Sequence, residues 1–166
     1  MPVNTNAAIE ITAFRWVPEF AQGVVRDLRA RWALEEAGFD YRVRLVGQER
    51  PPEYLLEQPF DQVPCFSDGQ VKIFESGAIV QYISEQTEAL LPRNPQDRFR
   101  AIQWTYAALN SVEPAILNLR RVREEAEKDA VLRVLGRVNG NYSKAAELLG
   151  VSRPTLYDLM HRCGLK

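Results

Sequence analysis

The side chains that most often carry catalysis or bind metals are few in this sequence and far apart. Cys65 and Cys163 are the only cysteines, too distant along the chain for a CxxC redox pair or a thiolate zinc site. His161 is the only histidine, and no Asp/Ser pair or second histidine accompanies it to build a catalytic triad or a metal site. We therefore expect no metal and no disulfide framework, with Cys65 a buried strand thiol and His161 on an exposed helix surface.

Charge is divided unevenly along the chain of 166 residues. Residues 121–166 hold nine Lys/Arg and six Asp/Glu, a net charge of +3, whereas residues 1–120 hold 12 and 16, a net charge of -4. A basic end on an acidic body favours a nucleic acid or another polyanion as partner of the C-terminal part. With 46% hydrophobic residues, the composition is that of a folded globular protein.

Membrane and export signals are not found in the sequence. No apolar run approaches the roughly 20 residues that a membrane-spanning helix needs, and the opening MPVNTNAAIE lacks the basic and apolar regions of an export signal. We expect a cytoplasmic protein with no membrane partner.

Alternating strand and helix patterns fill the first half of the chain. Residues 8–16 and 41–46 favour strands, and in the second Arg42 and Arg44 are expected to face water. Helical spacing covers residues 22–38, a short helix is expected at 51–58, VPCF and VKIF predict a β-hairpin, and a helix follows at 76–84. The order is βαβαββα, an α/β fold.

The second half of the chain is helical. Asn94 and Pro95 predict a helix start, and Pro114 lies within the pattern as a kink or break. From Leu119 a highly charged helix begins, for which Val122, Ala126, Leu132, Leu135 and Val138 are predicted to line one face. A short helix follows, then a turn at Gly150, then a helix that Ser152 caps, which together make a helix-turn-helix. Trp32, Phe99 and Trp104 are expected to pack in the core or between helices.

The N-terminal pattern resembles the thioredoxin-like domain of glutathione transferases. RWALEEAGFDY (31–41), QVPCFSDG (62–69) and FESGAIVQYI (74–83) carry the resemblance, which covers residues 1–90, and residues 91–120 resemble the first helix of that family's helical domain. The resemblance implies a glutathione site. Its implied residues are Gln62, Val63, Pro64, Glu75 and Ser76, with the bond before Pro64 cis, Val63 pairing its backbone with the cysteinyl unit, and Ser76 and Glu75 receiving the γ-glutamyl carboxylate and ammonium.

Two departures from that family concern catalysis. The family activates the glutathione thiol with a Ser, Tyr or Cys near the start of its first helix, and AFRWVPEFAQGVVRD (13–27) contains none of them. The family also builds its acceptor pocket from several further helices, of which one has a counterpart here. We therefore assign no catalytic residue and expect glutathione as a ligand rather than as a substrate that is turned over.

The C-terminal part resembles the Fis-type helix-turn-helix of sigma-54-dependent activators and response regulators. NGNYSKAAELLGVSRPTLYDLMHRCGLK carries the resemblance, which covers residues 121–166. In this mode the first turn of the second helix meets base edges in the major groove, and Arg153 is the main candidate because its guanidinium can bind guanine bidentately. The predicted DNA-binding residues are Lys144, Ser152, Arg153, Thr155, Tyr157, Arg162 and Lys166, with Lys144, Arg162 and Lys166 on the phosphate backbone.

The sequence thus predicts a thioredoxin-like α/β domain followed by an all-α helix-turn-helix domain. Its predicted function is sequence-specific binding of double-stranded DNA as a homodimer. Two alternatives remain: a glutathione transferase with a truncated helical domain, and an interaction protein whose N-terminal half only dimerises.

Overall fold

The computed structural model describes residues 3–165. Contacts divide the chain into an N-terminal unit (residues 1–107) and a C-terminal unit (residues 108–166), and each has its own hydrophobic core. Within residues 3–165, no helix is both long enough and apolar enough to cross a bilayer.

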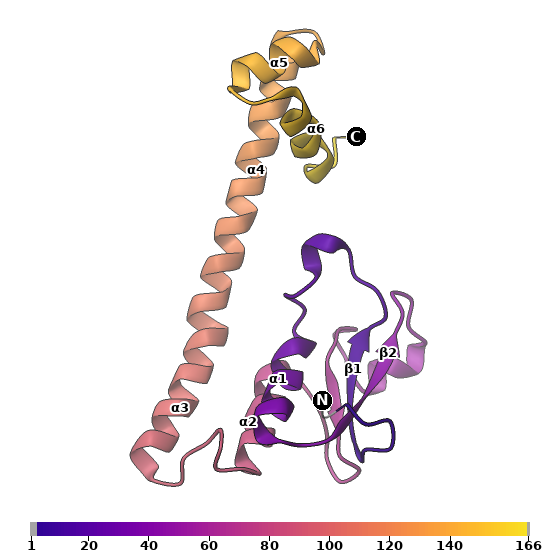
Figure 1. Ribbon diagram of the computed structural model, residues 1–166, viewed down its shortest axis with the longest axis vertical. Helices are drawn as coiled ribbons and strands as arrows, with labels where there is room; N and C mark the ends of the chain where they lie inside the picture. Colours follow the sequence, from indigo (N-terminus) through magenta and orange to yellow (C-terminus); the bar gives the residue numbers. More distant parts are fainter. Residues whose placement is uncertain (1–2, 166) are drawn as a thin grey trace. The chain divides into compact units, whose positions relative to one another are not determined.

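A mixed four-stranded sheet forms the centre of the N-terminal unit, in the order β2-β1-β3-β4 (Figure 1). Its strands are β1 (Ile9–Phe14), β2 (Tyr41–Val46), β3 (Cys65–Ser67) and β4 (Lys72–Phe74). β1 and β2 are parallel, and β3 is antiparallel to both β1 and β4. Parallel strands need a long crossover, which here contains the short 3₁₀ helix η1 (Glu19–Ala21) and α1 (Asp27–Ala37).

The predicted element order is confirmed, with two changes at helix boundaries. α1 begins at Asp27 rather than near residue 22, because Gly23 has φ +79°, which no α-helix accommodates. The segment predicted as a short helix is the 3₁₀ helix η2 (Pro52–Leu56), which begins directly after Pro51. α2 (Ser76–Glu85) and α3 (Pro95–Ala107) follow, and the Asn94 side chain caps α3 by accepting a hydrogen bond from the Asp97 N–H at 2.9 Å.

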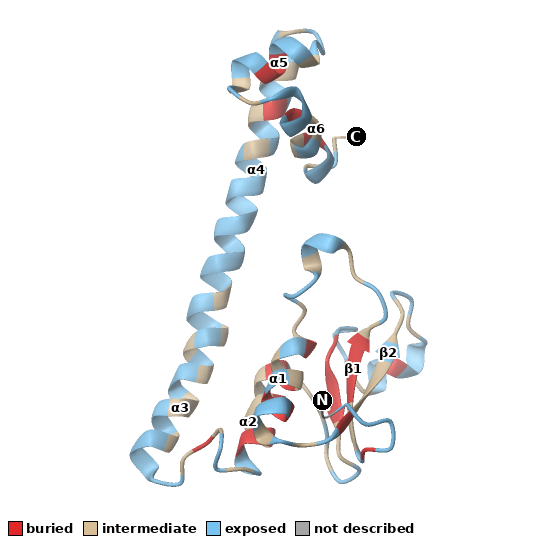
Figure 2. Ribbon diagram, in the orientation of Figure 1, coloured by how far each residue is buried: buried red, intermediate tan, exposed pale blue. Residues whose placement is uncertain are grey.

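α1 and α2 cover one face of the sheet and enclose the core of the N-terminal unit. The buried residues lie on β1, at the start of β2, on β3 and on the two helices (Figure 2). The largest of them are Ile11, Leu34, Tyr41, Phe66, Ile79 and Ile83. Tyr41 closes one edge of this core, because its hydroxyl donates to the Glu35 carboxylate at 2.9 Å.

Several side chains of this unit differ from the sequence prediction. Trp32, Phe99 and Trp104, expected to pack, are 69%, 66% and 64% exposed. The helices predicted around them are present, but none of the three belongs to the core that residues 3–107 form. Arg42 and Arg44 do not simply face water: both bind Glu10 on the neighbouring strand, at 3.1 and 2.8 Å.

The C-terminal unit consists of helices. A single π-helical turn, η3 (Ala108–Val112), precedes α4 (Glu113–Arg137), and α5 (Tyr142–Leu149) and α6 (Arg153–Arg162) follow. The predicted irregularity at Pro114 is this π turn, since proline lacks an N–H and its ring collides with the carbonyl four residues earlier. α4 is continuous through residues 119–121, where the composition of the sequence changes.

α5 and α6 pack on the last turns of α4. The buried core holds Val131, Ala145, Ala146, Leu156 and Met160. Only the last part of the predicted α4 face is correct: Leu135 and Val138 pack on this core, whereas Val122, Ala126 and Leu132 are exposed. The residues that pack (131, 134, 135 and 138) follow the i, i+3, i+4, i+7 spacing of one helix face, and the exposed three lie off that face.

Candidate functional sites

The first turn of α6 is exposed and capped by its own side chains. Ser152 is the N-cap and accepts a hydrogen bond from the Thr155 N–H at 3.2 Å, and the two hydroxyl oxygens lie 2.7 Å apart. Ser152 and Thr155 therefore satisfy each other locally. Arg153 lies between them in the sequence, and its side chain is exposed.

Arg153 lies against Tyr157, which in turn contacts a second tyrosine. Its Nη2 donates to the Tyr157 hydroxyl at 3.5 Å, and its guanidinium carbon is 5.9 Å from the centre of the Tyr157 ring. The Tyr157 ring contacts the Tyr142 ring of α5, with centroids 5.5 Å apart and planes at 44°. The sequence analysis named Arg153 and Tyr157 but missed Tyr142, because only the packing of α5 on α6 brings Tyr142 to Tyr157.

The predicted phosphate contacts occupy different surroundings. Lys144 is exposed in the first turn of α5. Its backbone N–H donates a hydrogen bond at 3.1 Å to the side chain of Asn141, which caps this helix. Arg162, in the last turn of α6, lies 3.6 Å from the Glu127 carboxylate of α4. Lys166 lies outside the described residues. Glu127 also binds Arg123 at 2.9 Å, so Arg162 shares this carboxylate with a second arginine.

In the N-terminal unit, strand register brings the five predicted glutathione residues to one place. Cys65 at the start of β3 pairs with Phe74 at the end of β4. Because the strands are antiparallel, Pro64, just before Cys65, and Glu75, just after Phe74, lie at the same end of the sheet. The segment Gln62–Pro64 and the start of α2 are therefore neighbours, as a bound tripeptide would require.

Glu75 and Ser76 form the start of α2. Glu75 has φ +70° and ψ 113°, a backbone conformation that residues other than glycine rarely adopt. The first backbone N–H groups of a helix have no acceptor within the helix, and the Glu75 side chain does not cap those of α2, so they are suited to an anion. Ser76 is 3% exposed, and its hydroxyl oxygen accepts a hydrogen bond from Arg29 of α1 at 3.3 Å.

A buried hydroxyl network holds the segment that contains the cis Val63–Pro64 bond. The Tyr54 hydroxyl donates a hydrogen bond to the Gln62 carbonyl at 2.7 Å. Thr12 Oγ1 lies 3.2 Å from the Tyr54 hydroxyl oxygen and accepts a hydrogen bond from the Cys65 backbone N–H at 2.7 Å. Gln62 is exposed, whereas Val63 and Pro64 are buried. Sequence reasoning missed Tyr54 and Thr12, which support this segment from the core.

The Tyr54 network predicts a change at alkaline pH. Burial raises the pKa of Tyr54 to about 12, against about 10 for an unfolded chain. A raised pKa in the folded state means that the stability contributed by the neutral phenol is complete below pH 10 and is lost as the pH rises toward 12. We expect the difference between the 295 nm titrations of the wild type and Tyr54→Phe to have its midpoint near pH 12. A midpoint near 10 would show that the phenol is solvated.

The segment between β1 and α1 lacks a side-chain hydroxyl or thiol that could activate a glutathione thiol, which leaves backbone N–H groups for that role. It contains no Ser, Tyr or Cys from residue 13 to 27, and the neighbouring Thr12 is 1% exposed and bonded within the core. Asp27, at the start of α1, is buried and lies 3.5 Å from Arg31, and burial raises the pKa of its carboxyl group. Among residues 3–165, no cluster of His, Cys, Asp and Glu has the makings of a metal site.

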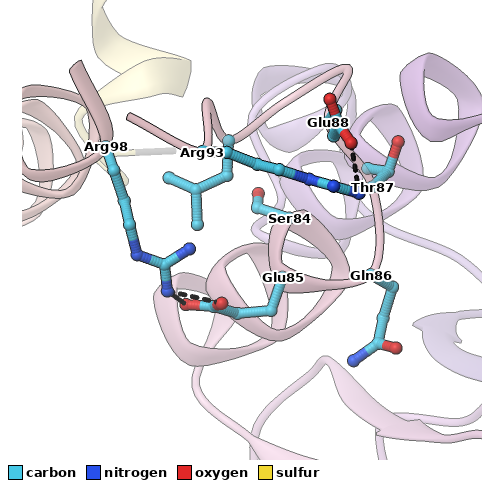
Figure 3. Close-up of a pocket in the computed structure, with 8 residues that line it drawn as sticks. Ser84, Glu85, Gln86, Thr87, Glu88, Arg93 and Arg98 are labelled. Carbon is cyan, nitrogen blue, oxygen red and sulfur yellow. Dashed lines mark hydrogen bonds and ion pairs between the residues drawn. The ribbon is translucent and has the colours of Figure 1, made fainter. Parts of the chain in front are cut away.

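A cavity of about 500 Å³ lies between the end of α2 and the start of α3 (Figure 3). Its charged side chains are engaged with one another: Arg98 binds Glu85 at 2.5 Å, and Arg93 binds Glu88. None of the predicted site residues lines it. The cavity is thus separate from both candidate sites.

Comparisons with known proteins divide the chain in the same way. Residues 21–85 match the family model "Glutathione S-transferase, N-terminal domain", and residues 122–160 match "Bacterial regulatory protein, Fis family".

Individual relatives match the first part of the chain. Glutathione S-transferase F10 of Arabidopsis thaliana is 40% identical over 99 residues, which cover 55% of this chain and 46% of that protein. The disulfide-bond oxidoreductase YfcG of Escherichia coli (strain K12) is 31% identical over 94 residues, which cover 50% of this chain and 44% of that protein. The chain thus spans less than half the length of these relatives.

Solved structures show the same fold. The theta class glutathione S-transferase of Xanthomonas axonopodis pv. citri, determined with glutathione bound, superposes with a TM-score of 0.53 and 32% identity, covering 63% of this chain and 50% of that one. The chain therefore combines a glutathione-transferase-like thioredoxin domain, matched at residues 21–85, with a Fis-type helix-turn-helix, matched at residues 122–160.

Proposed function

We propose that the protein binds double-stranded DNA in a sequence-specific manner through its C-terminal unit. The observation that carries this proposal is Arg153, exposed in the first turn of a capped helix that packs at an angle on α5. In a helix-turn-helix this turn meets base edges, and an arginine there can donate two hydrogen bonds to guanine. Lys144, Arg162 and Lys166 would contact the phosphates on either side.

One copy of this unit reads half a site, so we propose that the protein binds as a homodimer. Two-fold pairing places two recognition helices about 34 Å apart, one turn of DNA, on a palindromic operator. We also propose that the protein binds this DNA in the cytoplasm. The mass of the complex on a single duplex, measured by sedimentation, gives two copies per duplex if the pairing is correct.

The first test is the salt dependence of duplex binding. With three phosphate contacts per copy, the logarithm of the association constant falls against the logarithm of salt concentration with a slope of roughly -3 per bound copy. The measurement is a gel shift with a duplex selected by the protein from a randomised pool. No retained duplex at low salt, or a slope near zero, contradicts the proposal.

A second proposed function is glutathione binding by the N-terminal unit, and the backbone of Glu75 favours it. A glutamate held at φ +70° is strained, and strained backbone conformations cluster at ligand-binding and active sites. Here the Glu75 carboxylate would bind the ammonium of the γ-glutamyl unit of glutathione, and the N–H groups at the start of α2 would bind the carboxylate of that unit. Since no thiol-activating residue is present, we propose binding without fast conjugation.

Calorimetric titration with glutathione tests this second function. Glu75→Gln keeps the size and backbone of the site but loses the charge, and we expect its affinity for glutathione to fall about tenfold, as for one lost ion pair of roughly 1.4 kcal/mol. Glu85→Gln, at the other end of α2, is the matched control and leaves the affinity unchanged. Equal affinities for Glu75→Gln and wild type contradict the role of Glu75, and rapid conjugation of an aromatic chloride contradicts binding without fast turnover.

A further inference from the structure

Tyr142, Tyr157 and Arg153 form a continuous series of contacts, called the stack below, across the two short helices of the C-terminal unit. Tyr142 is the first residue of α5, Arg153 the first of α6, and Tyr157 lies one turn further along α6. Each neighbouring pair is in contact: ring on ring for the tyrosines, guanidinium on ring and hydroxyl for Arg153. The stack therefore connects the start of α5 to the side chain predicted to read a base.

Such a stack acts on the freedom of Arg153. An exposed arginine samples many rotamers, and ordering a long side chain on binding costs about 1 kcal/mol or more. A guanidinium held over an aromatic ring loses part of that freedom before DNA arrives, and its planar donors stay available at the edge. Where Tyr157 lies thus determines where Arg153 points.

Tyr142 determines where Tyr157 lies. Tyr157 is fixed at its base by α6, whose neighbouring Leu156 is fully buried, but its ring is half-buried and leans on the Tyr142 ring. Tyr142 itself packs on the core of the C-terminal unit at its inner side. It thereby transmits the position of α5 to the recognition turn of α6.

We propose that Tyr142 is a positioning residue for DNA sequence discrimination, acting through Tyr157 on Arg153. The inference rests on the proposed DNA-binding function and adds to it a residue that does not itself reach the DNA. It separates discrimination from affinity, because the phosphate contacts do not depend on the stack.

The test compares Tyr142→Leu, Tyr142→Phe and the wild type on two duplexes. One duplex is selected by the wild type from a randomised pool, and the other carries a single G·C to A·T change at the position where Arg153→Ala loses its preference. We expect Tyr142→Leu, which keeps apolar bulk but removes the aromatic face, to lower the ratio of the two affinities three- to tenfold. Tyr142→Phe keeps the ratio, and all three proteins keep the same salt dependence.

The double variant Tyr142→Leu/Arg153→Ala makes the test decisive. If Tyr142 acts through Arg153, the double variant has the ratio of Arg153→Ala alone. An unchanged ratio in a folded Tyr142→Leu protein overturns the inference. An equal loss of preference at every base pair overturns it as well. Both outcomes leave the proposed function standing. Failure of the wild type to bind any duplex overturns both.

Discussion

Leu156→Ala unfolds the C-terminal unit in a large fraction of molecules. Leu156 is 0% exposed at the centre of the core that joins α4, α5 and α6. Truncating a buried leucine to alanine removes transfer free energy and leaves a cavity, together about 2–5 kcal/mol. A core of this small size supplies a net stability of only about 3–5 kcal/mol, so the substitution removes most of it.

Two-dimensional NMR of the full chain measures this result. The dispersed amide signals of residues 108–166 collapse in Leu156→Ala, and those of the N-terminal unit persist because its core is separate. Leu148→Ala is the matched control: Leu148 is 58% exposed on α5, and its truncation leaves the spectrum folded. A fully dispersed Leu156→Ala spectrum would mean that α6 is held by contacts other than this core.

Arg153→Ala abolishes most of the sequence preference of DNA binding. A bidentate contact between arginine and guanine contributes about 1–3 kcal/mol of discrimination, roughly 5- to 150-fold in relative affinity. The residual binding stays close to that of the wild type on unrelated duplexes, because phosphate contacts supply it. Fluorescence anisotropy with the selected duplex and a scrambled one measures both quantities.

Arg162→Ala is the control for this experiment, since Arg162 lies at the opposite end of α6 beside Glu127. Its loss weakens binding to the selected and the scrambled duplex by the same factor, as a phosphate contact does. If Arg153→Ala also weakens both duplexes equally, Arg153 binds phosphate, and the base-reading residue lies elsewhere on α6.

Local signals in the sequence proved sufficient for most helix ends. Asn141 and Ser152 accept the hydrogen bonds that cap α5 and α6, and Gly150 ends α5 at φ +66°. These features depend on one residue and its nearest neighbours along the chain, so the sequence alone could predict them. The hairpin around Gly69, at φ +91°, was predictable for the same reason.

Burial was harder to predict than helix position. Val122 and Trp32 have the helical spacing of buried residues, yet they are 50% and 69% exposed. Periodicity tells which residues share a helix face, but another element must cover that face, and the spacing carries no information about it. Leu135 and Val138 are covered because α5 and α6 fold back on the end of α4.

By itself, the sequence determined the two kinds of domain, their order along the chain and the helix caps at Asn94, Asn141 and Ser152. The tertiary structure alone decided that Glu10 binds Arg42 and Arg44, that Tyr54 supports the segment before β3, and that Tyr142 reaches Tyr157. The physical reason is distance along the chain: these contacts join side chains whose separation in sequence sets no geometry until strand register and helix packing have been established.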